Sequence, residues 1–120
     1  MKLRIRGNSI RLRLSKTEVA AFQQYGSVAD IIEIPDRPIS YALEKGDSET
    51  LKVYRLEDSI RVMMPFDMAE RWNADDQVGF SYDQVIGEKK ITILVEKDFQ
   101  CSTPEDCEPE QDLYANPNLT

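Results

Sequence analysis

Charged and apolar residues alternate at the start of the chain. Residues 2–6 and 10–14 both show this period of two, which is typical of half-buried β-strands. Gly7-Asn8 lies between them, and a pair that begins with glycine suits a two-residue hairpin turn of type II′. In that register Arg4 faces Arg11, and successive side chains point to opposite sides of the hairpin. The apolar side holds Leu3, Ile5, Ile10, Leu12 and Leu14, and the basic side holds Lys2, Arg4, Arg6, Arg11 and Arg13.

A helix is predicted directly after this hairpin. Ser15 and Glu18 have the spacing of a capping box, Phe22 lies on the apolar face, and Gly26 is a typical residue just beyond a helix end. A second short helix is predicted over residues 65–72, because proline suits a first helical turn. Further strands are predicted over residues 27–34, 39–45, 50–56, 59–64, 77–83 and 89–97. Larger side chains of the two helices are expected in the core: Phe22, Phe66, Met68 and Trp72.

The predicted order of elements is ββαββ, followed by ββαββ again. Ser9-Ile10-Arg11 matches Ser59-Ile60-Arg61 at an offset of 50, and Glu44-Lys45 matches Glu96-Lys97 at an offset of 52. Amphipathic strands and helices must each bury one face, which requires a layered arrangement. We therefore predict an α+β fold in which two ββαββ halves form a mostly antiparallel sheet or an open barrel, with two short helices packed on one side.

The chain is long enough to form one domain with its own core. We expect this domain to cover residues 1–98, with an acidic extended tail over residues 99–120. The two halves of the domain are residues 1–46 and 50–98. Their similarity reflects either an internal duplication or a coincidence between two strand-rich segments.

Charge is distributed unevenly along the chain. The formal net charge is −7, yet residues 1–16 contain six basic residues and no acidic one. Residues 96–120 contain seven acidic residues and one lysine. An acidic chain is a poor binder of nucleic acid, so we do not expect nucleic acid as a partner. No apolar run approaches the ~20 residues that cross a bilayer, and the start of the chain lacks an apolar signal region, so we expect a cytoplasmic protein without membrane contact.

Motifs that carry chemistry are scarce. The chain contains no histidine, which is the commonest general base and metal ligand. Cys101 and Cys107 lack the spacing of a zinc site, and both are expected to be free thiols in a reducing compartment. Glu96 and Asp98 are candidates for holding Mg²⁺, against an interpretation as solvated charges at a strand end. Without a phosphate loop, nucleophile elbow or zinc motif, we expect no cofactor and favour a protein that is not an enzyme.

The basic side of the first hairpin is the feature that needs a functional interpretation. A cationic row on antiparallel strands often faces solvent and nothing else. Here, however, Arg4 faces Arg11 and Lys2 faces Arg13, and like charges in such positions destabilise a strand pair by roughly 0.2–1 kcal/mol. Neutralising charge should therefore lie nearby. The candidate anion-binding residues are Lys2, Arg4, Arg6, Arg11, Arg13 and Arg61.

Three sources of negative charge are open. The chain itself could supply it, through Asp30, Glu33 and Glu44 in neighbouring strands or through the acidic tail. A small anion such as phosphate or polyphosphate fits as well, because guanidinium groups bind phosphate oxygens in bidentate geometry. The third source is an acidic protein surface or a nucleic acid, although no aromatic residues for base stacking lie between the arginines.

Two functional interpretations follow from this surface. The preferred one is a small soluble binding or interaction protein with a basic strand face and an acidic tail. The alternative is a phosphate- or polyphosphate-binding enzyme or sensor. The sequence leaves the ligand and the oligomeric state open.

Three segments of the chain resemble a family of short bacterial proteins of unknown function: MKLRIRGNSIRLRLS at the start, ILVEKDFQC near residue 95 and YANPN near the end. The resemblance covers nearly the whole chain and implies a self-contained cytosolic domain without implying an activity. The segments LRIR and IRLRL are also similar to the basic strands of triphosphate tunnel enzymes, which are eight-stranded barrels with inward arginines and lysines. Those enzymes hold their metal with paired glutamates near the start of the chain, where this sequence has Lys2 to Arg6.

Overall fold

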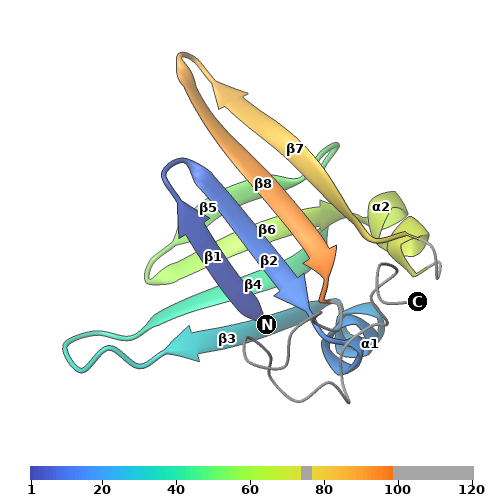
Figure 1. Cartoon of the computed structure of the whole chain (residues 1–120), viewed down its shortest axis with the longest axis horizontal. Coiled ribbons are helices and arrows are strands. Elements are labelled where there is room, and N and C mark those ends of the chain that lie inside the picture. The colour runs from blue at the N-terminus through green and yellow to red at the C-terminus, as the bar shows by residue number, and fades with distance from the viewer. Residues whose placement is uncertain (74–76, 99–120) are drawn as a thin grey trace, which may run out of the picture.

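The computed structural model of the chain describes residues 1–73 and 77–98. Their helices and strands follow the order ββαββ twice (Figure 1). The first half contains β1 (Lys2–Arg6), β2 (Ser9–Leu14), α1 (Lys16–Tyr25), β3 (Ser27–Ile32) and β4 (Ile39–Gly46). The second half contains β5 (Lys52–Leu56), β6 (Ser59–Pro65), α2 (Phe66–Trp72), β7 (Gly79–Ile86) and β8 (Lys89–Lys97). The predicted α+β fold of two ββαββ halves is confirmed.

The strands form two four-stranded sheets, and each sheet takes one hairpin from each half. Sheet A has the order β1-β2-β8-β7, and sheet B has the order β3-β4-β6-β5 (Figure 1). The hairpin pairings are antiparallel, whereas the central pairings, β2 with β8 and β4 with β6, are parallel. Neither half therefore completes a sheet without the other.

One hydrophobic cluster joins the two sheets and the two helices. Its buried side chains come from β2 and β8 of sheet A, from β4 and β6 of sheet B, from both helices, and from Leu51, which lies in the connection before β5. Phe22 of α1 and Trp72 of α2 pack edge to face, with 5.9 Å between the ring centroids. The largest fully buried side chains are Trp72, Phe22, Leu12, Leu14, Leu43, Leu51, Met64, Ile93, Val62 and Val95.

Helix α1 begins and ends as its sequence predicts. The Ser15 hydroxyl accepts a hydrogen bond from the Glu18 backbone N–H at 3.3 Å, and the Glu18 carboxylate accepts one from the Ser15 N–H at 3.0 Å. Gly26 ends the helix in the left-handed conformation, with φ of 87°. The prediction that Phe66 packs in the core is wrong. Its side chain is 58% exposed, because it lies outside the helical stripe by which Trp72 and its neighbours on α2 face the core.

Matching positions in the two halves make matching contacts. The Ser40 N–H donates to the Asp58 carbonyl, and the Thr92 N–H donates to the Asn8 carbonyl, both at 2.9 Å. These four residues are related by the offsets of 50 and 52 found in the sequence. The parallel pairings also agree, since β2 and β8 pair in the same register as β6 and β4. These contacts support the internal duplication, which stays a prediction.

The first residue of each matching hairpin turn has a positive φ, 55° at Gly7 and 52° at Glu57. A side chain in this conformation is strained by about 1 kcal/mol, because Cβ approaches the backbone. We expect Glu57→Gly to raise the free energy of unfolding by about 0.5–1 kcal/mol, measured by urea denaturation. In the reciprocal control, Gly7→Ala should lower it by a similar amount. A Glu57→Gly variant that is less stable than the unchanged chain would contradict this expectation.

Candidate functional site

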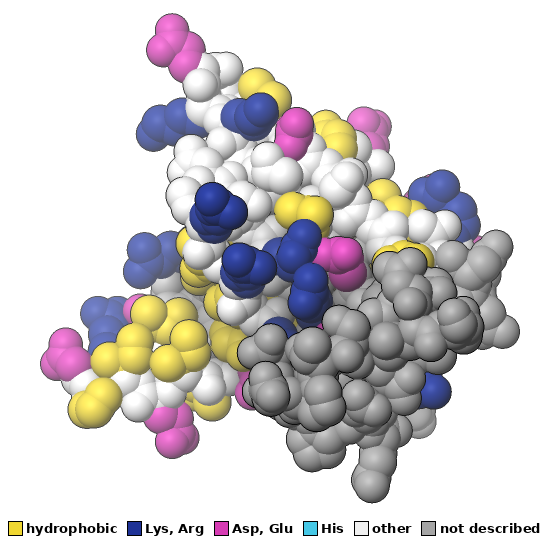
Figure 2. Space-filling view, viewed as in Figure 1, with side chains coloured by type: hydrophobic (Ala, Val, Ile, Leu, Met, Phe, Trp, Pro, Cys, Tyr) yellow, Lys and Arg dark blue, Asp and Glu magenta, His cyan; other side chains and the backbone are white. Residues whose placement is uncertain are grey.

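The basic residues of the first hairpin lie on the outer face of sheet A. Arg4 pairs with Arg11 and Lys2 pairs with Arg13 across β1 and β2, as the alternation predicts. The apolar residues between the arginines of β2 are buried in the core. In Figure 2 the Lys and Arg side chains gather over this hairpin, on the face turned to the viewer. We name these five residues the basic row: Lys2, Arg4, Arg6, Arg11 and Arg13.

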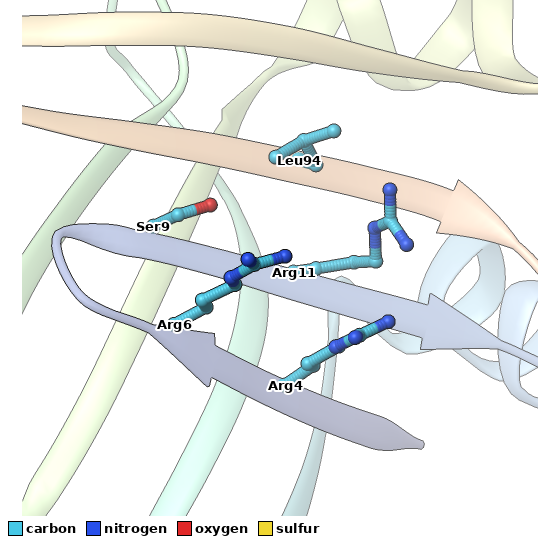
Figure 3. A pocket seen from close by; sticks show the side chains of 5 residues that line it. All are labelled: Arg4, Arg6, Ser9, Arg11 and Leu94. Carbon is cyan, nitrogen blue, oxygen red and sulfur yellow. The ribbon is translucent and has the colours of Figure 1, made fainter.

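Two open pockets lie along the basic row and share Arg4 and Arg11. The first has a volume of about 210 Å³ and is lined by Arg4, Arg6, Ser9, Arg11 and Leu94. The second has a volume of about 130 Å³ and is lined by Lys2, Arg4, Arg11 and Arg13. Figure 3 shows that the long side chains of Arg4, Arg6 and Arg11 extend in the same direction, toward the end of β2. Their guanidinium groups therefore gather around one space.

Two members of the basic row are paired with carboxylates at the end of β8. Arg11 Nε lies 2.8 Å from a carboxylate oxygen of Glu96, and Lys2 Nζ lies 2.8 Å from one of Asp98. The first contact is an ion pair without an aligned hydrogen bond, since that Glu96 oxygen accepts none. Both carboxylates proposed as magnesium ligands are thus engaged with cations. Within the described residues, no group of three or more His, Cys, Asp or Glu side chains could hold a metal ion.

The other three arginines of the row have no acidic partner among residues 1–73 and 77–98. We name Arg4, Arg6 and Arg13 the outer arginines. Two of them come from β1, which is an edge strand of sheet A, and the third comes from β2. They give the outer face of sheet A an excess of positive charge in a chain whose net charge is −7.

The acidic residues of neighbouring strands that the sequence offers as one source of negative charge make no ion-pair contact with the row among the described residues. Asp30 is on β3, where its carboxylate is 3.4 Å from the amino group of Met1. Glu33 is exposed beyond β3, and Glu44 is on β4 in sheet B. Cys101, Cys107 and the acidic tail lie outside the described residues.

Arg61 is separated from the basic row. It lies on β6 of sheet B and donates a hydrogen bond to Glu44 at 3.1 Å. The Tyr54 hydroxyl also donates to Glu44, and this bond, together with burial, raises the pKa of Tyr54 above 10.0. The pocket that Arg61 lines has a volume of about 290 Å³ and includes apolar residues such as Leu56.

Sheet B repeats one ion pair of the site. Arg11 and Glu96 in sheet A match Arg61 and Glu44 in sheet B at the offsets of 50 and 52. The same arginine–glutamate pair therefore bridges the central strands of both sheets, although only one sheet carries the basic row. We interpret this pair as part of the scaffold that both sheets use.

The outer arginines have no basic counterpart in sheet B. The positions that lie 50 residues further along the chain hold one aromatic and two apolar side chains: Tyr54, Leu56 and Met63. These residues occupy the same register positions on β5 and β6 as the arginines do on β1 and β2. A sheet of this kind therefore forms without cations at these positions. For this reason we do not count the outer arginines among the residues that the fold requires.

Sequence reasoning missed two residues that line the first pocket. Ser9 lies opposite Arg6 in the hairpin register, so its position near the arginines could have been read from the sequence. Leu94 reaches the pocket because β8 pairs with β2, and the sequence carries no local signal for that pairing.

The fold and the site define a small α+β protein with a cationic face on one of its two sheets. The chain belongs to the family of unknown function DUF7009, whose model matches residues 1–118. The resemblance to a family of unknown function is thereby confirmed. No curated protein and no solved structure matches the chain. Neither helix in the described part of the chain is long and apolar enough to cross a membrane.

Proposed function

We propose that this protein is a binding module that holds an anionic partner on the outer face of sheet A. The observation that carries this proposal is the set of outer arginines, which share two open pockets and have no acidic partner among the described residues. Arginine is well suited to such a role, because its guanidinium group donates several hydrogen bonds in a fixed planar arrangement.

Repulsion between like charges on the outer face of sheet A favours the binding of an anion there. Like charges opposite each other on neighbouring strands destabilise the pair by roughly 0.2–1 kcal/mol. Arg11 and Lys2 are compensated by carboxylates, whereas Arg4, Arg6 and Arg13 are not. An anion that contacts the outer arginines would remove this repulsion and would bind the folded state alone, so it would stabilise the fold.

The scaffold also holds one of the donors, Arg11, in place before a ligand arrives. Strand β2 is paired on both sides, with β1 and with β8. Arg11, which lines both pockets, is held by its ion pair with Glu96. Such preorganisation reduces the conformational entropy that binding would otherwise remove.

A second candidate function is a sensor or enzyme for a phosphorylated small molecule. The first pocket favours it, because three guanidinium groups and the hydroxyl of Ser9 are donors that suit phosphoryl oxygens. This candidate uses the same residues as the binding module and differs in the size of the ligand.

The proposal can be tested with four anionic probes at low salt, each with and without Mg²⁺: tripolyphosphate, pyrophosphate, inorganic phosphate and poly-glutamate. We expect the multivalent probes to raise the melting temperature of the protein and to bind in calorimetry. Arg4→Gln/Arg6→Gln should weaken the tightest probe about tenfold or more, which corresponds to about 1.4 kcal/mol. The matched control is Lys52→Gln/Arg55→Gln, which removes the same charge from β5, the equivalent strand of sheet B.

The outcomes separate the candidates. Tighter binding of poly-glutamate than of tripolyphosphate supports an acidic protein partner, and the reverse order supports a phosphorylated ligand. If no probe binds, or if the control variant loses as much affinity as the Arg4/Arg6 variant, the proposal is wrong. Circular dichroism checks that both double variants keep the fold, as expected for changes at exposed positions.

A further inference from the structure

The described part of the chain ends beside the basic row. Asp98 follows β8, and its carboxylate lies 2.8 Å from Lys2 Nζ. Its backbone N–H donates to the Leu14 carbonyl at 2.8 Å, and its side chain is only 8% exposed. These contacts fix the point from which the chain continues. The described part of the chain therefore ends at Asp98, in contact with Lys2, which lines the pocket shared with Arg4, Arg11 and Arg13.

The sequence that follows is acidic and contains no lysine or arginine. Residues 99–120 hold five acidic side chains: Glu105, Asp106, Glu108, Glu110 and Asp112. The basic row contributes five cations, and two of them are already paired with Glu96 and Asp98. The five carboxylates of this segment are therefore enough to neutralise the three cations that remain, the outer arginines.

The acidic residues are within reach of every outer arginine. Seven residue steps lead from Asp98 to Glu105, and an extended chain covers ~3.3 Å per step, or about 23 Å in total. The row from Lys2 to Arg6 is four strand steps long, which is about 13 Å.

We propose that residues 105–112 bind the outer arginines of their own chain and occupy the face that an external anion would use. The inference concerns the same face as the proposed function but does not require that an external ligand exists. A short tether gives an effective concentration of the order of millimolar, so the segment competes with weakly bound free anions. Each exposed ion pair contributes only roughly 0.2–1 kcal/mol, so a tightly bound multivalent anion displaces the segment. The acidic segment thus sets a threshold for ligand binding.

A spin label tests the contact directly in the full chain. Cys101→Ser leaves Cys107 as the single thiol, in the middle of the acidic segment. A nitroxide attached to Cys107 should broaden the NMR amide signals of β1 and β2, while the signals of β5, the equivalent strand of sheet B, keep their width. Raising the salt to about 1 M should remove the broadening, because screening shortens the range of the attraction to about 3 Å.

Neutralising the acidic segment tests the competition. The full-length variant carries Glu105→Gln, Asp106→Asn, Glu108→Gln, Glu110→Gln and Asp112→Asn. We expect it to lose the broadening on β1 and β2 and to bind tripolyphosphate about threefold tighter or more, since the intrachain competitor is gone. The amide side chains keep the size of the originals, so the comparison isolates charge.

Three results overturn the inference. The first is that the nitroxide broadens the amide signals of neither β1 nor β2 at low salt. The second is that these signals are broadened as much in the neutralised variant as in the chain with its acidic residues. The third is broadening in a mixture of two kinds of copy, one that carries the nitroxide without isotope label and one that carries the isotope label without nitroxide, when the singly prepared protein shows none. This result would assign the contact to a second molecule. If the broadening occurs but no variant binds tripolyphosphate or poly-glutamate, the proposed function fails while this inference stands.

Discussion

Trp72→Ala should lower the free energy of unfolding by about 3–5 kcal/mol. The Trp72 side chain is 0% exposed and packs edge to face on Phe22, with 5.9 Å between the ring centroids. Its indole N–H also donates to the Val78 carbonyl at 3.1 Å. The substitution therefore creates a cavity, removes an aromatic pair and leaves a carbonyl without this donor. Because small domains are stable by only 5–15 kcal/mol, we expect this variant to be close to unfolding.

Phe66→Ala is the matched control for this prediction. Phe66 is also an aromatic residue of α2, but its side chain is 58% exposed, so its loss should change stability by less than about 1 kcal/mol. Urea denaturation followed by circular dichroism measures both variants. A loss for Trp72→Ala below about 1.5 kcal/mol would contradict the view that this side chain joins the two halves of the core.

Gly79→Ala should destabilise the protein by about 3 kcal/mol, at the upper end of the usual cost of overpacking. A Cβ atom at Gly79 would lie 2.2 Å from the Val95 carbonyl oxygen and 2.8 Å from Glu96 Cα. Both atoms belong to the backbone of β8, which is held on its other side by β2. Strand β7 would have to shift away from β8 to relieve the contact, at the expense of pairing between the two strands.

Gly46→Ala is the control that distinguishes the two kinds of contact. A Cβ atom there would lie 2.3 Å from Met63 Sδ, which is near the end of a flexible side chain. Met63 can rotate away, so we expect a loss of about 1 kcal/mol or less. Thermal and urea unfolding compare the two variants. Equal losses would show that the rigidity of β8 is not the reason for the cost at Gly79.

Local features of the fold could be predicted because they depend on neighbouring residues. The alternation around Gly7-Asn8 gives both the register of the first hairpin and the side on which each residue lies. The spacing of Ser15 and Glu18 gives the start of α1. Strand order could not be predicted, since alternation tells a strand which face is buried and not which strand lies beside it. Ser9 pairs with Thr92, which is 83 residues away, and no local pattern indicates that contact.

The candidate site shows the same division. The basic row could be predicted because it belongs to one hairpin, whereas its partners lie on β8 or directly after it, at the other end of the described residues. From the sequence alone Glu96 is a candidate magnesium ligand or a solvated charge at a strand end, and the structure places its carboxylate beside Arg11. Arg61 was grouped with the row by residue type, although it lies in the other sheet. The sequence shows which side chains are charged, whereas the tertiary structure determines which charged side chains contact each other.

The exchange of hairpins between the two sheets has a consequence for assembly. Taken alone, a single ββαββ unit would leave both of its central strands with an open edge, and a second unit would fill each of them. The chain is in this sense organised as two subunits of a dimer that residues 47–51 connect covalently. Among the described strands, the parallel pairing of β2 with β8 joins residues that are 83 positions apart, such as Ser9 and Thr92, so we expect the protein to fold more slowly than a helical domain of equal size.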